Sequence, residues 1–129
     1  MRRRHKKFKR HPVELLACAI ALEEGWFAPG ENLPKSNNNP GDLDFAGQLN
    51  AAPNGRFAKF PTAAMGIAAL FRQIWLQVAE GQTVRQLVAQ WAPATENNTS
   101  VYLANVLRWT GLPPDVPILH LLPPLAQLD

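Results

Sequence analysis

The sequence has few of the residues from which disulfides and metal sites are built. Its 129 residues include one cysteine, Cys18, and three histidines. A single cysteine excludes a disulfide within the chain, so we expect Cys18 to be a small buried core residue. His5 and His11 lie in a basic N-terminal segment, and His120 stands alone among leucines, without the spacing of a metal site. Neither a metal nor a cofactor is therefore predicted.

Long apolar runs are also missing. The run from Leu15 to Leu22 is shorter than the roughly 20 residues that cross a bilayer as a helix, and it ends at Glu23 and Glu24. The apolar stretch before Cys18 is too short for the core of a secretion signal and contains Glu14. We therefore expect a protein made in the cytoplasm without a signal peptide.

Positive charge is concentrated at the N-terminus. The formal net charge is +3, but seven of the thirteen Lys and Arg residues precede position 11, which leaves six basic against ten acidic residues, or −4, in the rest. We expect residues 1–11 to form a disordered basic tail that either stays solvated or contacts an anionic wall, a membrane or nucleic acid through residues 2–10. No zinc spacing, phosphate loop or RNA-binding motif accompanies it, which argues against nucleic-acid recognition as the main function. The seven residues are Arg2, Arg3, Arg4, Lys6, Lys7, Lys9 and Arg10.

The first half of the chain predicts a buried helix followed by a small β region. Pro12 suits the first turn of a helix that runs to Glu24, and the absence of a polar face between residues 15 and 22 is typical of burial. Between residues 26 and 61, Gly, Pro and Asn mark turns. The alternating fragments 41–45 and 56–60 predict the two strands of a short hairpin.

The second half predicts three or four helices. Three are expected at 62–80, at 83–91 and from about 98 to 111, with Thr62 and Thr83 as caps. We assign residues 12–112 to one mainly α domain, and expect the Pro- and Leu-rich segment 113–129 to pack on it with a helical turn within 116–122. The expected buried side of the first of these helices carries Met65, Ala69, Leu70, Ile74, Leu76 and Val78, and Trp75, Trp91 and Trp109 are expected in the core.

Two adjacent carboxyl groups end the first predicted helix. Glycosidic bond cleavage needs a carboxylic acid that keeps its proton near neutral pH, and burial or nearby negative charge raises a carboxyl pKa. Glu23 and Glu24 adjoin each other, the C-terminal carbonyls of a buried helix, and Trp26 and Phe27. One of them is therefore a candidate general acid, unless both simply end the apolar run and face water.

Four blocks of sequence together resemble the lysozyme-like superfamily, most of all the small muramidase-like or lytic-transglycosylase-like domains of bacteriophage virions and prophages. The resemblance covers roughly residues 13–112 and implies an α+β lysozyme-like fold. It also implies an enzyme that acts on peptidoglycan glycan strands, at the bacterial cell wall or as a virion component. The blocks are Ala19–Trp26, Asn37–Leu43, Gly55–Thr62, and Trp91–Pro93 with Glu96–Thr99 and Tyr102.

The resemblance assigns residues to roles. In the superfamily the catalytic Glu ends a buried helix and precedes a small residue, which implies Glu24 before Gly25, with Glu23 as a neighbour. Tyr102 would approach Glu24, or would instead be a half-buried helix tyrosine with one hydrogen bond. Candidate walls of the sugar site are Asn38, Asn39 and Gly41. Trp26 and Phe27 are candidates for stacking on a sugar, because they border the proposed acid.

The sequence also departs from the family pattern. Asp42 stands where relatives often have Asn, and Asp44 where they have a basic residue, so a more acidic cleft should raise the pKa of Glu24 further. The Gly-x-x-Gln and Tyr-Asn-Ala-Gly motifs of transglycosylases are not clearly present, and Gly47-Gln48 is at best a remnant.

Three functions follow as expectations. The first is a lytic transglycosylase that cleaves the MurNAc-GlcNAc bond with Glu24 alone as acid and base. The second is a muramidase that adds Asp42 or Asp44 as a second carboxylate. The third is a non-catalytic module of the same fold that binds peptidoglycan or serves as a structural part of a virion.

Overall fold

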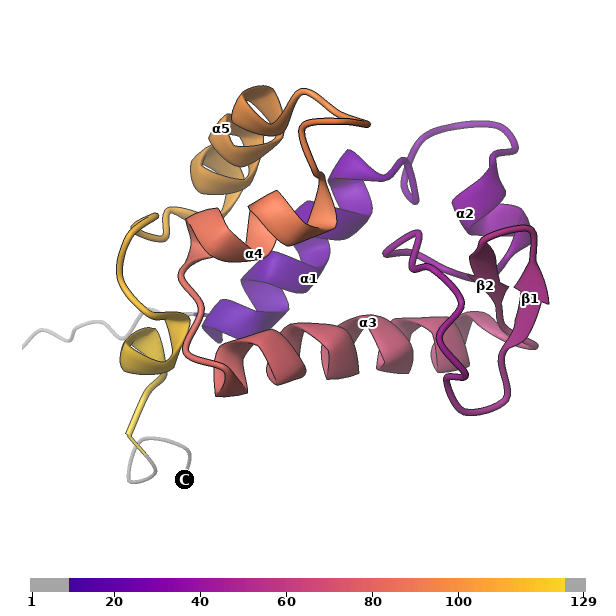
Figure 1. Ribbon diagram of the computed structural model, residues 1–129, viewed down its shortest axis with the longest axis horizontal. Coiled ribbons are helices and arrows are strands. Elements are labelled where there is room, and N and C mark those ends of the chain that lie inside the picture. The colour runs from indigo at the N-terminus through magenta and orange to yellow at the C-terminus, as the bar shows by residue number, and fades with distance from the viewer. Residues whose placement is uncertain (1–9, 125–129) are drawn as a thin grey trace, which may run out of the picture.

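A computed structural model of the protein describes residues 10–124. They form a mainly α-helical fold with one two-stranded antiparallel sheet (Figure 1). Residues 1–9, which are expected to be disordered, lie outside the described residues. Residues 125–129 of the C-terminal segment do so as well. The elements are α1 (Pro12–Glu23), α2 (Leu33–Ser36), β1 (Ala52–Asn54), β2 (Phe57–Lys59), α3 (Ala63–Ala79), α4 (Val84–Trp91), α5 (Thr99–Thr110) and the 3-10 helix η1 (Ile118–Leu121).

Helix α1 lies at the centre of the helical part, where it packs against α5 and α3 (Figure 1). The helix begins as the sequence predicts, because the His11 Nδ1 accepts the backbone N–H of Val13 at 3.2 Å and Pro12 occupies the first turn. Leu16 and Ile20 are fully buried, and Cys18 is half-buried. The core therefore holds the middle of α1, whereas Leu22 near its end is 44% exposed, against the expected burial.

Helix α3 confirms the predicted caps but not the whole of the predicted buried side. Thr62 caps its start and Glu80 its end. Leu70, Ile74 and Val78 are buried, whereas Met65 and Leu76 are exposed. Because nearly every position of this helix is apolar, the sequence pattern does not distinguish the buried face from the exposed one.

The expectation that every helical tryptophan is a core residue was also wrong. Trp75 on α3 and Trp109 on α5 are 43% and 40% exposed, and neither belongs to the buried core cluster. Trp91, at the end of α4, is half-buried and packs against the core.

The β region differs most from its prediction. The second predicted strand matches β2, but the first is wrong, because β2 pairs with β1 in the register Ala52↔Lys59. Residues 41–45 form a loop that touches the sheet only through the bridge between Asp44 and Phe57. The short helix α2, capped by the Asn32 side chain, was not predicted.

The C-terminal segment packs on the helices as far as it is described. Ile118 of η1 is fully buried, Thr83 and Pro117 form a β-bridge, and Arg85 binds the Asp115 carboxylate at 2.7 Å. Within residues 10–124 no helix combines the length and apolar character needed to cross a membrane.

Candidate active site

The end of α1 holds the Glu24 carboxyl group in a fixed place. Glu24 is the C-terminal cap of the helix, and its backbone N–H bonds to the Ile20 carbonyl at 2.9 Å. Gly25 follows at a φ of +88°, a conformation that favours glycine, and turns the chain away from the helix axis. The Asn32 amide then donates to the Gly25 carbonyl at 2.8 Å. The backbone on both sides of Glu24 is therefore tied down.

Helix α5 contacts both carboxyl groups at the end of α1. The Tyr102 hydroxyl donates to the Glu24 Oε2 at 2.8 Å. The Asn105 amide donates to both carboxylate oxygens of Glu23, at 3.0 and 3.3 Å. Sequence reasoning missed Asn105, although its position three residues after Tyr102 places the two side chains on the same helix face.

The surroundings of Glu24 raise its pKa from 4.5 to about 7. Burial is the largest cause, because removal from water disfavours the charged form. The Tyr102 hydrogen bond acts in the opposite direction, and the negative charges of Asp42 and Glu23 raise the pKa further. Tyr102 itself stays protonated, since burial and the adjacent Glu24 carboxyl raise the pKa of its hydroxyl well above the usual value. Glu24 is thus poised to give up or take a proton near neutral pH.

Asp42 lies in a strained part of the loop that precedes β1. Its backbone has a φ of +49°, which is uncommon for a residue with a side chain, and its N–H bonds to the Asn39 carbonyl at 3.0 Å. Its carboxyl Oδ1 is buried without a hydrogen-bond partner. Burial raises the pKa of Asp42, Arg56 opposes this, and Asp44 adds to it.

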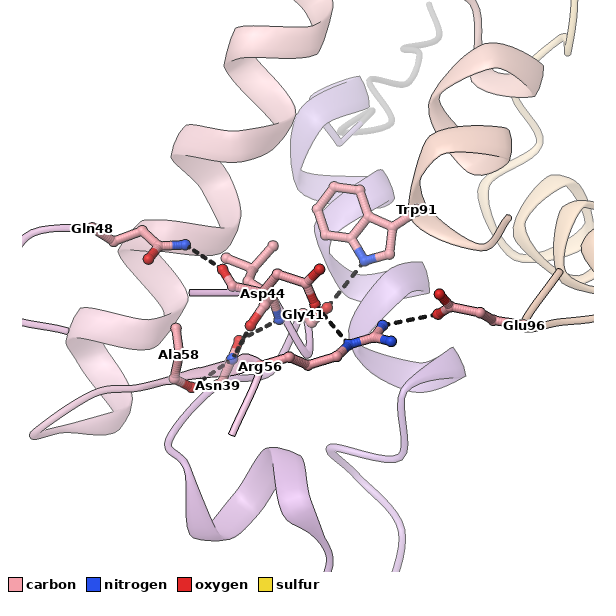
Figure 2. A network of polar contacts seen from close by, with 9 residues as sticks. Asn39, Gly41, Asp44, Gln48, Arg56, Ala58, Trp91 and Glu96 are labelled. Carbon is pink, nitrogen blue, oxygen red and sulfur yellow. Dashed lines mark hydrogen bonds and ion pairs between the residues drawn. The ribbon is translucent and has the colours of Figure 1, made fainter. Parts of the chain in front are cut away.

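The Asn-rich loop forms the frame that presents Asp42. Asn39 is fully buried, and its side chain bonds to the backbone of Leu43 and Ala58 at 2.8 to 2.9 Å. Asn38 donates to the Phe60 carbonyl at 2.9 Å. Both residues are candidate walls of the sugar site, but Asn39 is fully buried and has no exposed surface that could contact a ligand. Its hydrogen bonds hold the loop to β2 instead (Figure 2).

Gly41 is buried in the same loop, where a side chain would not fit. A Cβ there would lie 2.9 Å from the Leu70 Cδ1 and 3.1 Å from the Trp91 Cζ2. The Trp91 indole N–H also bonds to the Gly41 carbonyl at 3.0 Å (Figure 2). Gly41 therefore joins the loop to α3 and α4.

A polar cavity of about 330 Å³ extends from Asp42 between the loop, α3 and α4. Arg56 lies at its edge between two carboxylates, with Nε 3.1 Å from the Asp44 Oδ1 and Nη2 2.8 Å from the Glu96 Oε1 (Figure 2). Asp42 therefore belongs to this cavity and also acts on Glu24 through its charge. The lining residues are Asp42, Leu43, Asp44, Ala46, Gln48, Arg56, Gln73, Gln77, Gln90, Trp91, Pro93 and Glu96.

The sequence assigned no site role to Arg56, Glu96 or the glutamines of this cavity, although Arg56 and Glu96 lie within the quoted blocks. They come from four separate segments, and no local pattern links them. The two aromatic candidates after Glu24 differ from each other: Trp26 is half-buried and packs on the core, whereas Phe27 is 61% exposed.

Comparison of the chain with family models, curated proteins and solved structures finds no match. Within residues 10–124 no group of three His, Cys, Asp or Glu side chains is placed to hold a metal ion. The described residues therefore provide the half-buried Glu24 carboxyl group, whose pKa is about 7, and the Tyr102 hydroxyl as its hydrogen-bond donor. Asp42 supplies a second carboxyl group whose charge acts on Glu24.

Proposed function

We propose that the protein cleaves peptidoglycan glycan strands as a lytic transglycosylase, with Glu24 as its single acid and base. The observation that carries the proposal is the Glu24 carboxyl group, which is half-buried, accepts a 2.8 Å hydrogen bond from Tyr102, and has a pKa of about 7. A carboxylic acid with such a pKa is protonated often enough to act as an acid and ionised often enough to act as a base.

The reaction uses the same carboxyl group twice. Protonated Glu24 gives its proton to the glycosidic oxygen between MurNAc and GlcNAc, and the bond from that oxygen to the MurNAc anomeric carbon breaks. The substrate N-acetyl group can assist. The Glu24 carboxylate then takes the proton of the MurNAc 6-hydroxyl as that oxygen bonds to the anomeric carbon. A 1,6-anhydro end forms, and Glu24 regains its proton without water being consumed.

Tyr102 is the positioning residue of this scheme. Its hydroxyl donates to Glu24 and favours the carboxylate that exists between the two proton transfers. The negative charges of Asp42 and Glu23 favour the protonated acid that begins and ends the cycle. These opposing effects keep the pKa of Glu24 near 7.

A hydrolytic muramidase is the second candidate, and Asp42 is the observation that favours it. Asp44 is held by Arg56, whereas Asp42 has a buried carboxyl oxygen without a partner and acts on Glu24 through its charge. In this reaction Asp42 would serve as nucleophile or base, and water would end on the new reducing end.

The test replaces the acid and a matched glutamate. Glu24→Gln is expected to abolish release of muropeptides from purified cell walls, while circular dichroism shows a folded protein. Glu80→Gln is the control, because Glu80 also caps a helix and precedes a glycine of positive φ, but is exposed. Equal release by the wild type and Glu24→Gln would refute the proposal. Glu24-independent wall binding without any cleavage would instead indicate a non-catalytic module.

A further inference from the structure

Helix α3 has an exposed face that is apolar apart from Arg72. The helix has 17 residues, of which Arg72 is the only charged one. Six of its exposed residues recur every three or four positions and therefore lie on one side. We define the α3 face as Met65, Ala68, Arg72, Trp75, Leu76 and Ala79, all of which are exposed.

All six side chains of this face stay exposed, although Asn50 contacts Met65 and His11 contacts Trp75. Leu70, Ile74 and Val78 direct the opposite side of α3 into the core. Figure 1 shows α3 along one edge of the molecule, with the other helices and the sheet on its core side. Soluble proteins seldom leave a whole helix face both apolar and exposed without a partner for it.

A second apolar feature adjoins the face. The loop of residues 46–50 runs beside the first half of α3, and the two border an open groove lined by Leu49, Met65 and Ala68 among others. Leu49 is 85% exposed, and the neighbouring Asn50 amide lies 3.8 Å from the Met65 Sδ. The apolar surface is thus wider than the helix alone.

The basic N-terminal segment enters the fold at the other half of the same helix. The His11 and Trp75 rings lie with their centroids 5.5 Å apart, so the chain reaches α1 beside the α3 face. Arg10 comes immediately before His11, and residues 2–9 add six further Lys and Arg residues: Arg2, Arg3, Arg4, Lys6, Lys7 and Lys9. Positive charge is therefore joined to an exposed tryptophan and an apolar helix face.

We propose that the α3 face and the basic N-terminal segment together bind the surface of an anionic lipid bilayer. An apolar helix face can enter the interface between headgroups and acyl chains, while Lys and Arg residues pair with anionic headgroups. The apolar face alone or the basic segment alone would attach the protein weakly, whereas the two together would attach it stably. A nucleic acid would use the basic charge but leaves the α3 face unexplained.

Cosedimentation of the full-length protein with lipid vesicles tests this inference. Binding is expected to vesicles of phosphatidylcholine and phosphatidylglycerol in equal parts, and not to vesicles of phosphatidylcholine alone. The double variant Met65→Gln with Leu76→Gln should lower the partition constant at least about tenfold, because two apolar side chains no longer leave water. Replacing Arg2, Arg3 and Arg4 by Gln should lower it by a similar factor, and added salt should mimic this loss.

The matched control is the double variant Ile67→Gln with Val101→Gln. Ile67 is as exposed as Met65, 39% against 38%, but faces another side of α3, and Val101 is exposed on α5. This variant should bind like the wild type. Equal binding by all variants, or binding that only the arginine replacements weaken, would overturn the inference. A dimer in sedimentation that the Met65 and Leu76 replacements disrupt would assign the face to a second copy instead. None of these readouts depends on Glu24.

Discussion

At the scale of the residue, the chain contains two glutamates with the same local geometry and different surroundings. Glu24 and Glu80 both cap a helix, with φ and ψ of −81° and −3° against −77° and −2°, and each precedes a glycine of positive φ. Only Glu24 lies under Tyr102 and near Asp42. A helix end therefore does not by itself make an acid. The local sequence favours the pair Glu23 and Glu24 through the apolar helix and the aromatic residues beside it, but only the resemblance selects Glu24.

Tyr102→Phe tests the positioning role of the hydroxyl. The hydrogen bond lowers the pKa of Glu24, so its loss should raise that pKa above 7 and move the high-pH limb of the activity profile upward. The maximal rate should fall about tenfold, since a hydrogen bond to a charged group is lost. The pH dependence of kcat and an NMR titration of the Glu24 carboxyl measure both effects. A Tyr102 that only fills the core would change stability and leave the profile in place.

At the scale of the element, helices were predictable where their signals are local. Thr62, Thr83 and Asn98 each cap a helix with a side chain that accepts the N–H three residues on, and the sequence indicates all three starts. The first predicted strand fails because its side-chain alternation does not show how the loop is held. The Asn39 side chain takes the Leu43 N–H, and residues 41–45 pair with β2 only at the bridge between Asp44 and Phe57.

The contact between α3 and the Asn-rich loop gives a prediction for the whole site. Gly66 lies where a Cβ would be 1.7 Å from the Asn38 carbonyl oxygen. Gly66→Ala should therefore lower the free energy of unfolding by about 3 kcal/mol or more, although Ala is the better helix former. Ala68→Gly, at an exposed position of the same helix, should cost only about 1 kcal/mol.

Chemical denaturation of both variants measures these free energies. The loop moved by Gly66→Ala also carries Asp42, so the pKa of Glu24 should change in this variant and not in Ala68→Gly. A Gly66→Ala protein as stable as the wild type would contradict the close approach of α3 to Asn38.

At the scale of the whole molecule, the cost of burying Glu24 should appear in the pH dependence of stability. Folded Glu24 binds its proton more tightly than the unfolded chain, with a pKa of about 7 against 4.5. Unfolding therefore releases a proton within this window, and the free energy of unfolding should fall as pH rises from 4.5 to 7. The fall attributable to Glu24 should be about 1–3 kcal/mol, allowing for its partial exposure.

Glu24→Gln isolates this contribution. Its free energy of unfolding should match that of the wild type below the window and exceed it above, because glutamine carries no charge to bury. Other carboxyl groups, including Asp42, whose pKa burial raises, are present in both proteins, so their contributions largely cancel in the comparison. Urea denaturation at several pH values measures the difference. A difference that does not depend on pH would rule out a raised pKa for Glu24.

The whole molecule also shows where sequence reasoning ends. The mainly α class, the small β region and the end of the buried helix all follow from caps, breakers and apolar runs. The partners of Glu24 and Glu23, Tyr102 and Asn105, lie about eighty residues further along the chain. The cavity residues come from separate segments. Which face of α3 stays exposed depends on which side of this helix packs against the core. These features arise from packing between distant elements, which apolar periodicity does not encode.

Mass spectrometry of the products from purified peptidoglycan, digested in water enriched in heavy oxygen, distinguishes the two reactions. We expect 1,6-anhydro ends without heavy oxygen, formed by the wild type and by Glu80→Gln and absent with Glu24→Gln. Reducing ends that carry heavy oxygen and depend on both Glu24 and Asp42 would identify the hydrolase instead. Products of either kind formed equally by Glu24→Gln would contradict the assignment of Glu24 as the acid.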